Sequence, residues 1–263
     1  MSELRVPGAT LHYQVHGAGP VLLLIPGGTG GAAGFTAVLD RLTVDHTVLT
    51  YDPRGIGRSP LDEADAEQRV AEHAEDAARL LDLVAPGEPV RVFGASSGAI
   101  VALHLACVEP GRVARVVAHE PPLVEVLPDA GAQRAMVAGV REVWRSEGVP
   151  AAVAALATGL SRDGKPVQVG ELPPRLATAM GYFVGRIVPS FMVHRPDLGR
   201  LASLGDRVVP AVGAESHGEL PCRAAESLAA RLGREPVLFP GGHVGLSTHP
   251  AEFGDRLRQV LTA

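Results

Sequence analysis

One serine in this sequence lies in a pattern that is typical of a nucleophile. Ser96 is the middle residue of Gly94-Ala95-Ser96-Ser97-Gly98, which follows an apolar run and precedes a run of small residues. A sharp turn from strand to helix holds such a serine in a strained backbone conformation, and glycine two residues before and after it removes steric collisions. We therefore expect Ser96 to be a nucleophile. The alternative is a glycine-rich turn without a catalytic role, because the bare pattern also occurs by chance.

A serine nucleophile needs a base within hydrogen-bond reach and a carboxylate that orients this base. The chain has ten histidines. His243 is the best candidate for the base, because it follows the last expected strand in a glycine-flanked loop. His249 is expected at the start of a helix, and His104 is expected within one.

Two glutamates are candidates for the carboxylate. Glu120 lies two residues beyond the strand expected at 113–118 and precedes two prolines, whose missing N–H groups cannot satisfy a carboxylate. Glu215 lies in a later loop, where the usual spacing after the strand reaches Ser216, which cannot orient an imidazolium electrostatically. We favour Glu120 over Glu215. The predicted triad is Ser96, His243 and Glu120.

A glycine-rich segment, residues 25–31, is the candidate for stabilising an oxyanion. It follows an apolar strand-like run, where the fold needs an unobstructed backbone N–H group. We expect Gly28 and Ser97 to donate to the oxyanion. A phosphate-binding loop is disfavoured, because the segment lacks both a Gly-Lys-Ser/Thr ending and the Gly-x-Gly-x-x-Gly pattern. A second turn, residues 52–59, is interpreted as structural, with Asp52 and Arg54 pinning the loop.

The elements that must position these residues alternate between apolar strands and helices. Strands are expected at 11–15, 21–25, 46–51, 90–93, 113–118, 208–212 and 236–239. Helices are expected at 35–42, 64–84, 98–108, 221–232 and 250–261. Continuous apolar strands that alternate with helices predict an α/β fold, in which a mostly parallel sheet of about eight strands is covered on both faces.

A long segment between the strands, residues 122–204, reads as helical fragments broken by prolines. An insertion at the carboxyl edge of a parallel sheet lies where open α/β folds bind ligands. We therefore expect a helical lid over 122–204 and a core domain made of 1–121 and 205–263. For each apolar side chain of the lid, packing among its own helices is the alternative. Those expected to contact substrate are Trp144, Tyr182, Phe183 and Val184.

Composition limits the class of protein. The 263 residues are 46% hydrophobic and 20% charged, which is typical of a soluble globular chain. The net charge is −5 with no basic stripe, so no nucleic-acid partner is expected. No run is long enough to span a membrane and no signal peptide is recognisable, so we expect a cytoplasmic protein. Cys107 and Cys222 are expected to be free thiols. No metal or cofactor is expected, and a homodimer is left open.

These motifs together resemble the α/β-hydrolase family over essentially the whole chain. A narrower resemblance, to the zearalenone-type lactone hydrolases, is carried by Gly94–Ala99, His119–Pro122 and Phe239–His243. It implies a triad of Ser96, Glu120 and His243, with Gly28 and Ser97 as oxyanion donors. The lid has little similarity to theirs.

The leading hypothesis is a serine hydrolase that acts on an ester or lactone of an apolar, medium-sized molecule. A cofactor-free haloperoxidase or perhydrolase that uses the same triad is an alternative, and a ligand-binding receptor on the same fold is a non-enzymatic one. Haloalkane dehalogenase and epoxide hydrolase chemistry are disfavoured, because both use an aspartate in place of Ser96. The tryptophan that the lactone hydrolases carry in their lid is replaced here near Phe183 or Val184.

Overall fold

The computed structural model describes residues 2–262, which form one eight-stranded sheet in the order β1-β2-β4-β3-β5-β6-β7-β8. The strands are β1 (Ser2–Val6), β2 (Ala9–His16), β3 (Val21–Ile25), β4 (Thr47–Tyr51), β5 (Val90–Ala95), β6 (Val113–His119), β7 (Val208–Gly213) and β8 (Val237–Phe239). Pairing is parallel from β4 to β8, and β1 and β2 join the sheet antiparallel. The predicted fold class is therefore confirmed.

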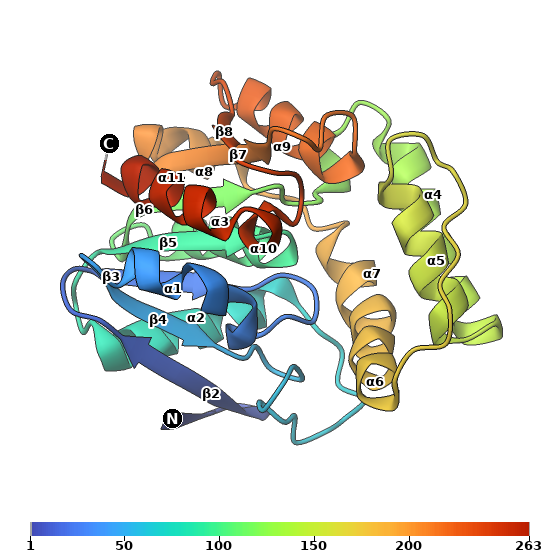
Figure 1. Ribbon diagram of the computed structural model, residues 1–263, viewed down its shortest axis with the longest axis horizontal. Coiled ribbons are helices and arrows are strands. Elements are labelled where there is room, and N and C mark those ends of the chain that lie inside the picture. Colours follow the sequence, from blue (N-terminus) through green and yellow to red (C-terminus); the bar gives the residue numbers. More distant parts are fainter. Residues whose placement is uncertain (1, 263) are drawn as a thin grey trace.

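Helices cover both faces of the sheet (Figure 1). On one face lie α1 (Thr36–Leu42) and α11 (Pro250–Thr262), and on the other lie α2 (Val70–Val84), α3 (Ser97–Val108) and α9 (Leu220–Arg231). Short helices η1 (Ala32–Phe35) and α10 (Gly245–Thr248) flank α1 and α11.

Strand β3 shows why the central strands read as continuous apolar runs. Leu22 and Leu24 pack in the cluster under α1 and α11, whereas Leu23 and Ile25 pack in the cluster under α2 and α3. Successive side chains of a strand point to opposite faces. Because both faces are covered, every position must be apolar.

Strand β1 and the start of helix α2 differ from the sequence-based expectation. Strand β1 was not expected, because three of its five residues are polar and only Val6 is buried. The helix expected over 64–84 begins only at Val70, as helix α2. Residues 64–69 contain no apolar side chain larger than alanine, so they have no hydrophobic face to bury and form a loop instead.

A helical insertion separates β6 from β7. It consists of η2 (Val124–Val126), α4 (Ala130–Ser146), α5 (Val149–Leu160), α6 (Pro174–Tyr182), the π-helix η3 (Phe183–Ile187), α7 (Val188–Phe191), α8 (Leu198–Ser203) and η4 (Gly205–Arg207). Figure 1 shows α4 to α7 as a layer standing beside the sheet, at the right of the view.

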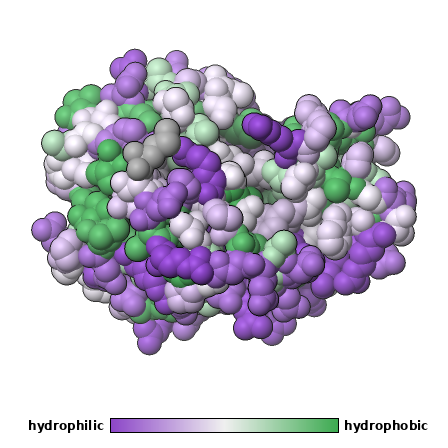
Figure 2. Space-filling view, turned by 90° about the horizontal axis from the view of Figure 1, so that it is seen from below, coloured by the Kyte–Doolittle hydropathy of each residue, from purple (hydrophilic) through white to green (hydrophobic). Residues whose placement is uncertain are grey.

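The surface carries polar residues over most of the face shown in Figure 2, and hydrophobic side chains form separate small groups. The outline is indented between the sheet body and the helical insertion. Among residues 2–262, no helix combines the length and the apolar character that a membrane span requires.

Candidate active site

Ser96 lies at the turn between β5 and α3, in the left-handed region of backbone conformation. Its φ is 52° and its ψ is −121°. Residues other than glycine rarely adopt this backbone conformation, so the surrounding structure must hold the turn in place. A Cβ atom at Gly98 would collide with the carbonyl oxygens of Ile25 and Pro26, and one at Gly94 would collide with α3. The two glycines therefore allow the strand and the helix to meet closely enough to expose the serine.

A continuous hydrogen-bond chain joins Ser96, His243 and Glu120. The Nε2 atom of His243 lies 3.1 Å from Ser96 Oγ, and its Nδ1 atom lies 2.6 Å from Glu120 Oε2. The imidazole is 24% exposed, whereas the carboxylate is fully buried. We assign the ring proton to Nδ1, because the carboxylate can only accept. In this tautomer, Nε2 is free to take the proton of Ser96.

Glu120 is fixed by partners on the neighbouring strand β7 and in the loop that follows it. Its φ is 49°, and its N–H group donates to Ala211 O at 3.0 Å. Carboxylate oxygen Oε1 accepts from the Gly213 N–H group at 2.8 Å and from the Ser216 hydroxyl. Burial alone would raise the pKa of Glu120, but hydrogen bonds from His243 and Ser216, among other interactions, bring it below its ordinary value. The ionised carboxylate is therefore held in one orientation.

The rival carboxylate lies elsewhere. The side chain of Glu215 is 64% exposed, and its carboxylate lies 3.7 Å from His249 Nε2. Ser216, which occupies the position where an acid was sought after β7, is instead fully buried against Glu120. The sequence reasoning missed this role for Ser216. The sequence feature that could have revealed this role is the position of Ser216, just beyond the carboxyl end of the strand that pairs with β6.

Gly28 and Ser97, the expected oxyanion donors, lie beside Ser96 and line the same cavity. The Gly28 N–H group donates to Ser97 Oγ at 3.1 Å. Gly28 has a φ of 57°, and a Cβ atom there would meet nothing within 4 Å, so the backbone borders open space. Backbone amides at the start of α3 carry the positive end of the helix dipole toward this space.

The cavity above Ser96 has a volume of about 300 Å³. Its floor comes from the sheet body and consists of Pro26, Gly27, Gly28, Gly30, Gly34, Phe35, Ala95, Ser96, Ser97, Pro122, Pro221, His243, Val244, Leu246 and Ser247. Its roof comes from the helical insertion and consists of Leu156, Leu160, Phe183, Ile187, Val188, Phe191 and Met192. Among these lining residues, no aspartate, glutamate, lysine or arginine occurs.

Of the four insertion residues expected to contact substrate, only Phe183 lies on the cavity wall. Val184 is fully buried in the hydrophobic core. Trp144 packs against Gly185, where a Cβ atom would meet the indole at 2.6 Å. Tyr182 points away from the cavity and donates its hydroxyl to Arg54 O at 2.9 Å. The structure corrects these three expectations, since the orientation of a helix about its axis depends on packing that no local motif encodes.

Other reactive groups of the chain lie apart from this site. Cys107 and Cys222 are buried free thiols in α3 and α9, as expected. Burial raises the pKa of Cys107 to about 11 and that of Cys222 to about 12, so neither is a thiolate at neutral pH. Within residues 2–262, no group of three or more His, Cys, Asp or Glu side chains is arranged to hold a metal ion.

Comparisons with known proteins bear on the family and the fold of this chain. Residues 20–160 match the family model described as alpha/beta hydrolase fold. The uncharacterized hydrolase YraK of Bacillus subtilis strain 168 is 36% identical over 264 residues, spanning 98% of this chain and 94% of YraK. A thermophilic esterase from Thermogutta terrifontis superposes with a TM-score of 0.73 at 18% identity, covering 100% of this chain and 98% of the esterase. An enol-lactonase from Burkholderia xenovorans LB400 gives 0.69 at 17% identity, with 100% of both chains covered. This chain belongs to the α/β-hydrolase family.

Proposed function

We propose that this protein is a serine hydrolase that cleaves carboxylic esters or lactones of neutral, apolar small molecules through an acyl-enzyme. The observation that carries the proposal is the hydrogen-bond chain from Ser96 through His243 to buried Glu120, which opens onto an apolar cavity. The esterase and enol-lactonase among the structural neighbours support the same reaction class.

In the first half of the proposed reaction, Ser96 Oγ forms a bond to the substrate carbonyl carbon while His243 Nε2 takes the hydroxyl proton. The carboxylate of Glu120 stabilises the resulting imidazolium. His243 then donates the proton to the alkoxide oxygen as the ester C–O bond breaks. In a lactone, the alcohol formed in this way stays attached to the acyl group.

In the second half, water attacks the acyl carbon while His243 takes a proton from it, and His243 then gives this proton to Ser96 Oγ as the bond between Ser96 and the acyl group breaks and the carboxylic acid leaves. The negative charge of each tetrahedral intermediate falls on an oxygen beside the backbone N–H groups of Gly28 and Ser97. The Gly28 N–H group now donates to Ser97 Oγ, and we propose that it turns to the stronger oxyanion acceptor during turnover.

The substrate class follows from the cavity wall. No aspartate, glutamate, lysine or arginine is present among the lining residues to pair with a substrate charge. Burying an unpaired charge is costly, so a charged acyl group is disfavoured. We therefore propose a neutral acyl group held under the helical insertion, which then acts as a lid. Both linear esters and lactones stay within the proposal, because the narrower resemblance to lactone hydrolases rests on sequence motifs alone.

A turnover screen tests this function. We expect hydrolysis of p-nitrophenyl esters or aliphatic lactones by the wild-type protein, and loss of at least about 10⁴-fold in kcat for Ser96→Ala. Ser227→Ala is a matched control, because Ser227 donates to Val126 O, away from the cavity. Peroxide-dependent activity with little ester hydrolysis would indicate a perhydrolase instead. No turnover on the whole panel would indicate a binding protein.

A further inference from the structure

One helical segment forms most of the cavity roof. It runs through α6, η3 and α7 to Met192, and it lines the cavity with Phe183, Ile187, Val188, Phe191 and Met192. Three of these side chains lie four positions apart and are here called the cavity row: Phe183, Ile187 and Phe191. Residues four apart lie on the same side of a helix. The position of this one segment therefore sets how far the row stands from Ser96.

The neighbouring row of the same segment binds the sheet body. These side chains, here called the docking row, are Tyr182, Arg186 and Ser190. They contact a loop, residues 54–68, here called the docking loop. The contacts are Tyr182 Oη to Arg54 O at 2.9 Å, Arg186 Nη2 to Asp65 Oδ1 at 2.7 Å, and Ser190 Oγ to Gln68 O at 2.7 Å. Asp65 is 94% exposed, so its ion pair contributes little. The hydrogen bonds of Tyr182 and Ser190 therefore hold the segment to the docking loop.

The segment changes from α-helix to π-helix and back in the stretch that carries the two rows. η3 is a π-helix, and Pro189 follows it. Proline has no N–H group to donate to the carbonyl four residues earlier, and its ring crowds that carbonyl, which favours a local widening of the helix. Gly185 lies inside this widened turn, where Trp144 of α4 packs directly against the backbone. The segment is thus held from behind by α4 and from the side by the docking loop.

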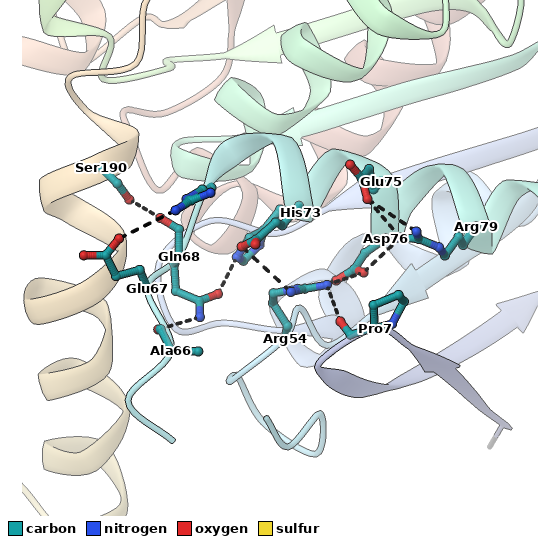
Figure 3. Close-up of polar contacts among 12 residues, drawn as sticks. Pro7, Arg54, Ala66, Glu67, Gln68, His73, Glu75, Asp76, Arg79 and Ser190 are labelled. Carbon is teal, nitrogen blue, oxygen red and sulfur yellow. Dashed lines mark hydrogen bonds and ion pairs between the residues drawn. The ribbon is translucent and has the colours of Figure 1, made fainter. Parts of the chain in front are cut away.

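The docking loop is itself anchored in the sheet body (Figure 3). The Arg54 guanidinium donates to both carboxylate oxygens of Asp76 at 2.7 Å, and it also donates to Pro7 O at 3.3 Å. Both partners of this ion pair are buried. The Tyr182 ring packs on Gly55, where any Cβ atom would collide with it. An attachment to this loop is therefore an attachment to a rigid support.

The docking loop also supports the cavity row through His73 of α2. The Gln68 side chain hydrogen-bonds His73 Nε2 at 3.0 Å, and the His73 ring packs edge-on against Phe191 with centroids 4.9 Å apart. Figure 3 shows Ser190 and Gln68 side by side at this point. The docking loop thus holds the segment by hydrogen bonds and, through His73, supports the ring of Phe191.

We propose that the docking row determines the substrate specificity of the cavity by fixing its width. Tyr182 and Ser190 are positioning residues in this proposal: they do not touch substrate, but they hold the cavity row at a set distance from Ser96. The inference rests on the proposed function for its substrates. When the two hydroxyl groups are removed, the segment moves more freely, and acyl groups branched beside the carbonyl gain access.

The test compares linear and branched substrates. For the double variant Tyr182→Phe/Ser190→Ala, we expect the ratio of kcat/KM for p-nitrophenyl 2-ethylhexanoate over p-nitrophenyl hexanoate to rise about tenfold, because two hydrogen bonds are lost. Each single variant should give about a threefold rise. Amide hydrogen exchange across residues 183–192 should become about tenfold faster in the double variant. Thr178→Ala is the control, since Thr178 donates only to Pro174 O within α6.

Three outcomes would overturn the inference or separate it from the proposed function. An unchanged ratio with unchanged exchange would show that the docking row does not hold the wall. Faster exchange with an unchanged ratio would show that the row supports the fold without selecting substrates. If the wild-type protein hydrolyses no ester, the proposed function fails. The inference is then judged by the relative affinities of 2-ethylhexanol and 1-hexanol, which must shift toward the branched alcohol in the double variant.

Discussion

The floor and the roof of the cavity are built in different ways. The reactive floor side chains follow parallel strands, and hydrogen bonds to the next strand hold their backbones: Ser96 N donates to His119 O at 2.9 Å, and Glu120 N donates to Ala211 O at 3.0 Å. The roof consists of apolar side chains on helices that meet the body through a few polar contacts at one edge. Changes in the floor should therefore affect the chemical step, and changes in the roof should affect substrate choice.

This difference follows from the geometry of the two kinds of element. Adjacent strands share a fixed register, in which Ala95 pairs with His119 and His119 pairs with Ala211. Residues that directly follow these strands meet at one edge of the sheet. Helices that pack through apolar side chains have no such register, and their positions depend on the fit of many contacts.

The largest effect among the floor substitutions after Ser96 is expected for Glu120→Gln. The amide keeps the shape of the side chain but cannot stabilise the imidazolium of His243, so kcat should fall roughly 10²- to 10⁴-fold. Glu215→Gln is the matched control and should cost less than about twofold, because Glu215 is exposed. Steady-state kinetics on folded variants measures both. Normal turnover in Glu120→Gln with a dead Glu215→Gln would return the acid to the loop after β7.

A smaller effect, about tenfold in kcat/KM, is expected for Ser216→Ala, which removes one of the donors to Glu120 Oε1. Losing this donor should raise the pKa of Glu120, which now lies below its ordinary value. The acid limb of the pH–rate profile should therefore move to higher pH. Ser216→Thr keeps the hydroxyl and should keep the limb in place if the methyl group is accommodated. An unshifted limb in Ser216→Ala would mean that Ser216 only fills space.

The lowered pKa of Glu120 also predicts how the free energy of unfolding depends on pH. A carboxylate whose pKa is lower in the folded state stabilises the fold above its unfolded pKa, and this contribution is lost as the pH falls through the folded pKa. Ser216→Ala should therefore reduce the free energy of unfolding more at neutral pH than in acid. Urea unfolding at several pH values measures this difference, with exposed Ser203→Ala as control.

In the roof, Phe183→Ala should change selectivity, whereas Trp144→Ala should change stability. Phe183 lies on the cavity wall, so its loss should alter kcat/KM for large acyl groups by about three- to tenfold and leave acetate esters nearly unaffected. Trp144 packs between helices, so its loss should lower the free energy of unfolding by roughly 2–4 kcal/mol. Equal losses on large and small esters for Phe183→Ala would indicate simple loosening of the fold.

The last prediction concerns the free energy of unfolding in acid, which depends on a histidine buried beneath the cavity floor. His119 is buried among Phe93, Phe239 and Phe253, and burial lowers its pKa from 6.5 to about 4. Between these values the unfolded chain binds more protons, so the free energy of unfolding falls as the pH drops from 6.5 toward 4, by up to about 3 kcal/mol from this group. His119→Phe should flatten this slope in thermal unfolding, whereas exposed His217→Phe should not. An equal slope in both variants would contradict this.

The sequence allowed the floor to be predicted further than the roof. Ser96, His243 and Glu120 each follow a strand in a short pattern of glycine or proline, and the order of parallel strands brings such ends together. In the roof, Phe183 and Val184 are neighbours in the chain, yet one lines the cavity and the other lies in the core. Neighbouring residues of any helix point in different directions, and the contact between Trp144 and Gly185 helps to set which of the two faces the cavity. This contact joins residues that lie far apart in the chain, so no local pattern of composition or periodicity reveals it.

The central claim is that Ser96 is a nucleophile activated by His243. Labelling with a fluorophosphonate tests it most directly, because this reagent requires an activated serine beside an oxyanion-binding site. Intact-mass analysis of the wild-type protein should show one adduct, and peptide mapping should assign it to Ser96. Labelling should disappear in Ser96→Ala. An adduct on Ser97, or no adduct under conditions that label a known serine hydrolase, would contradict the account.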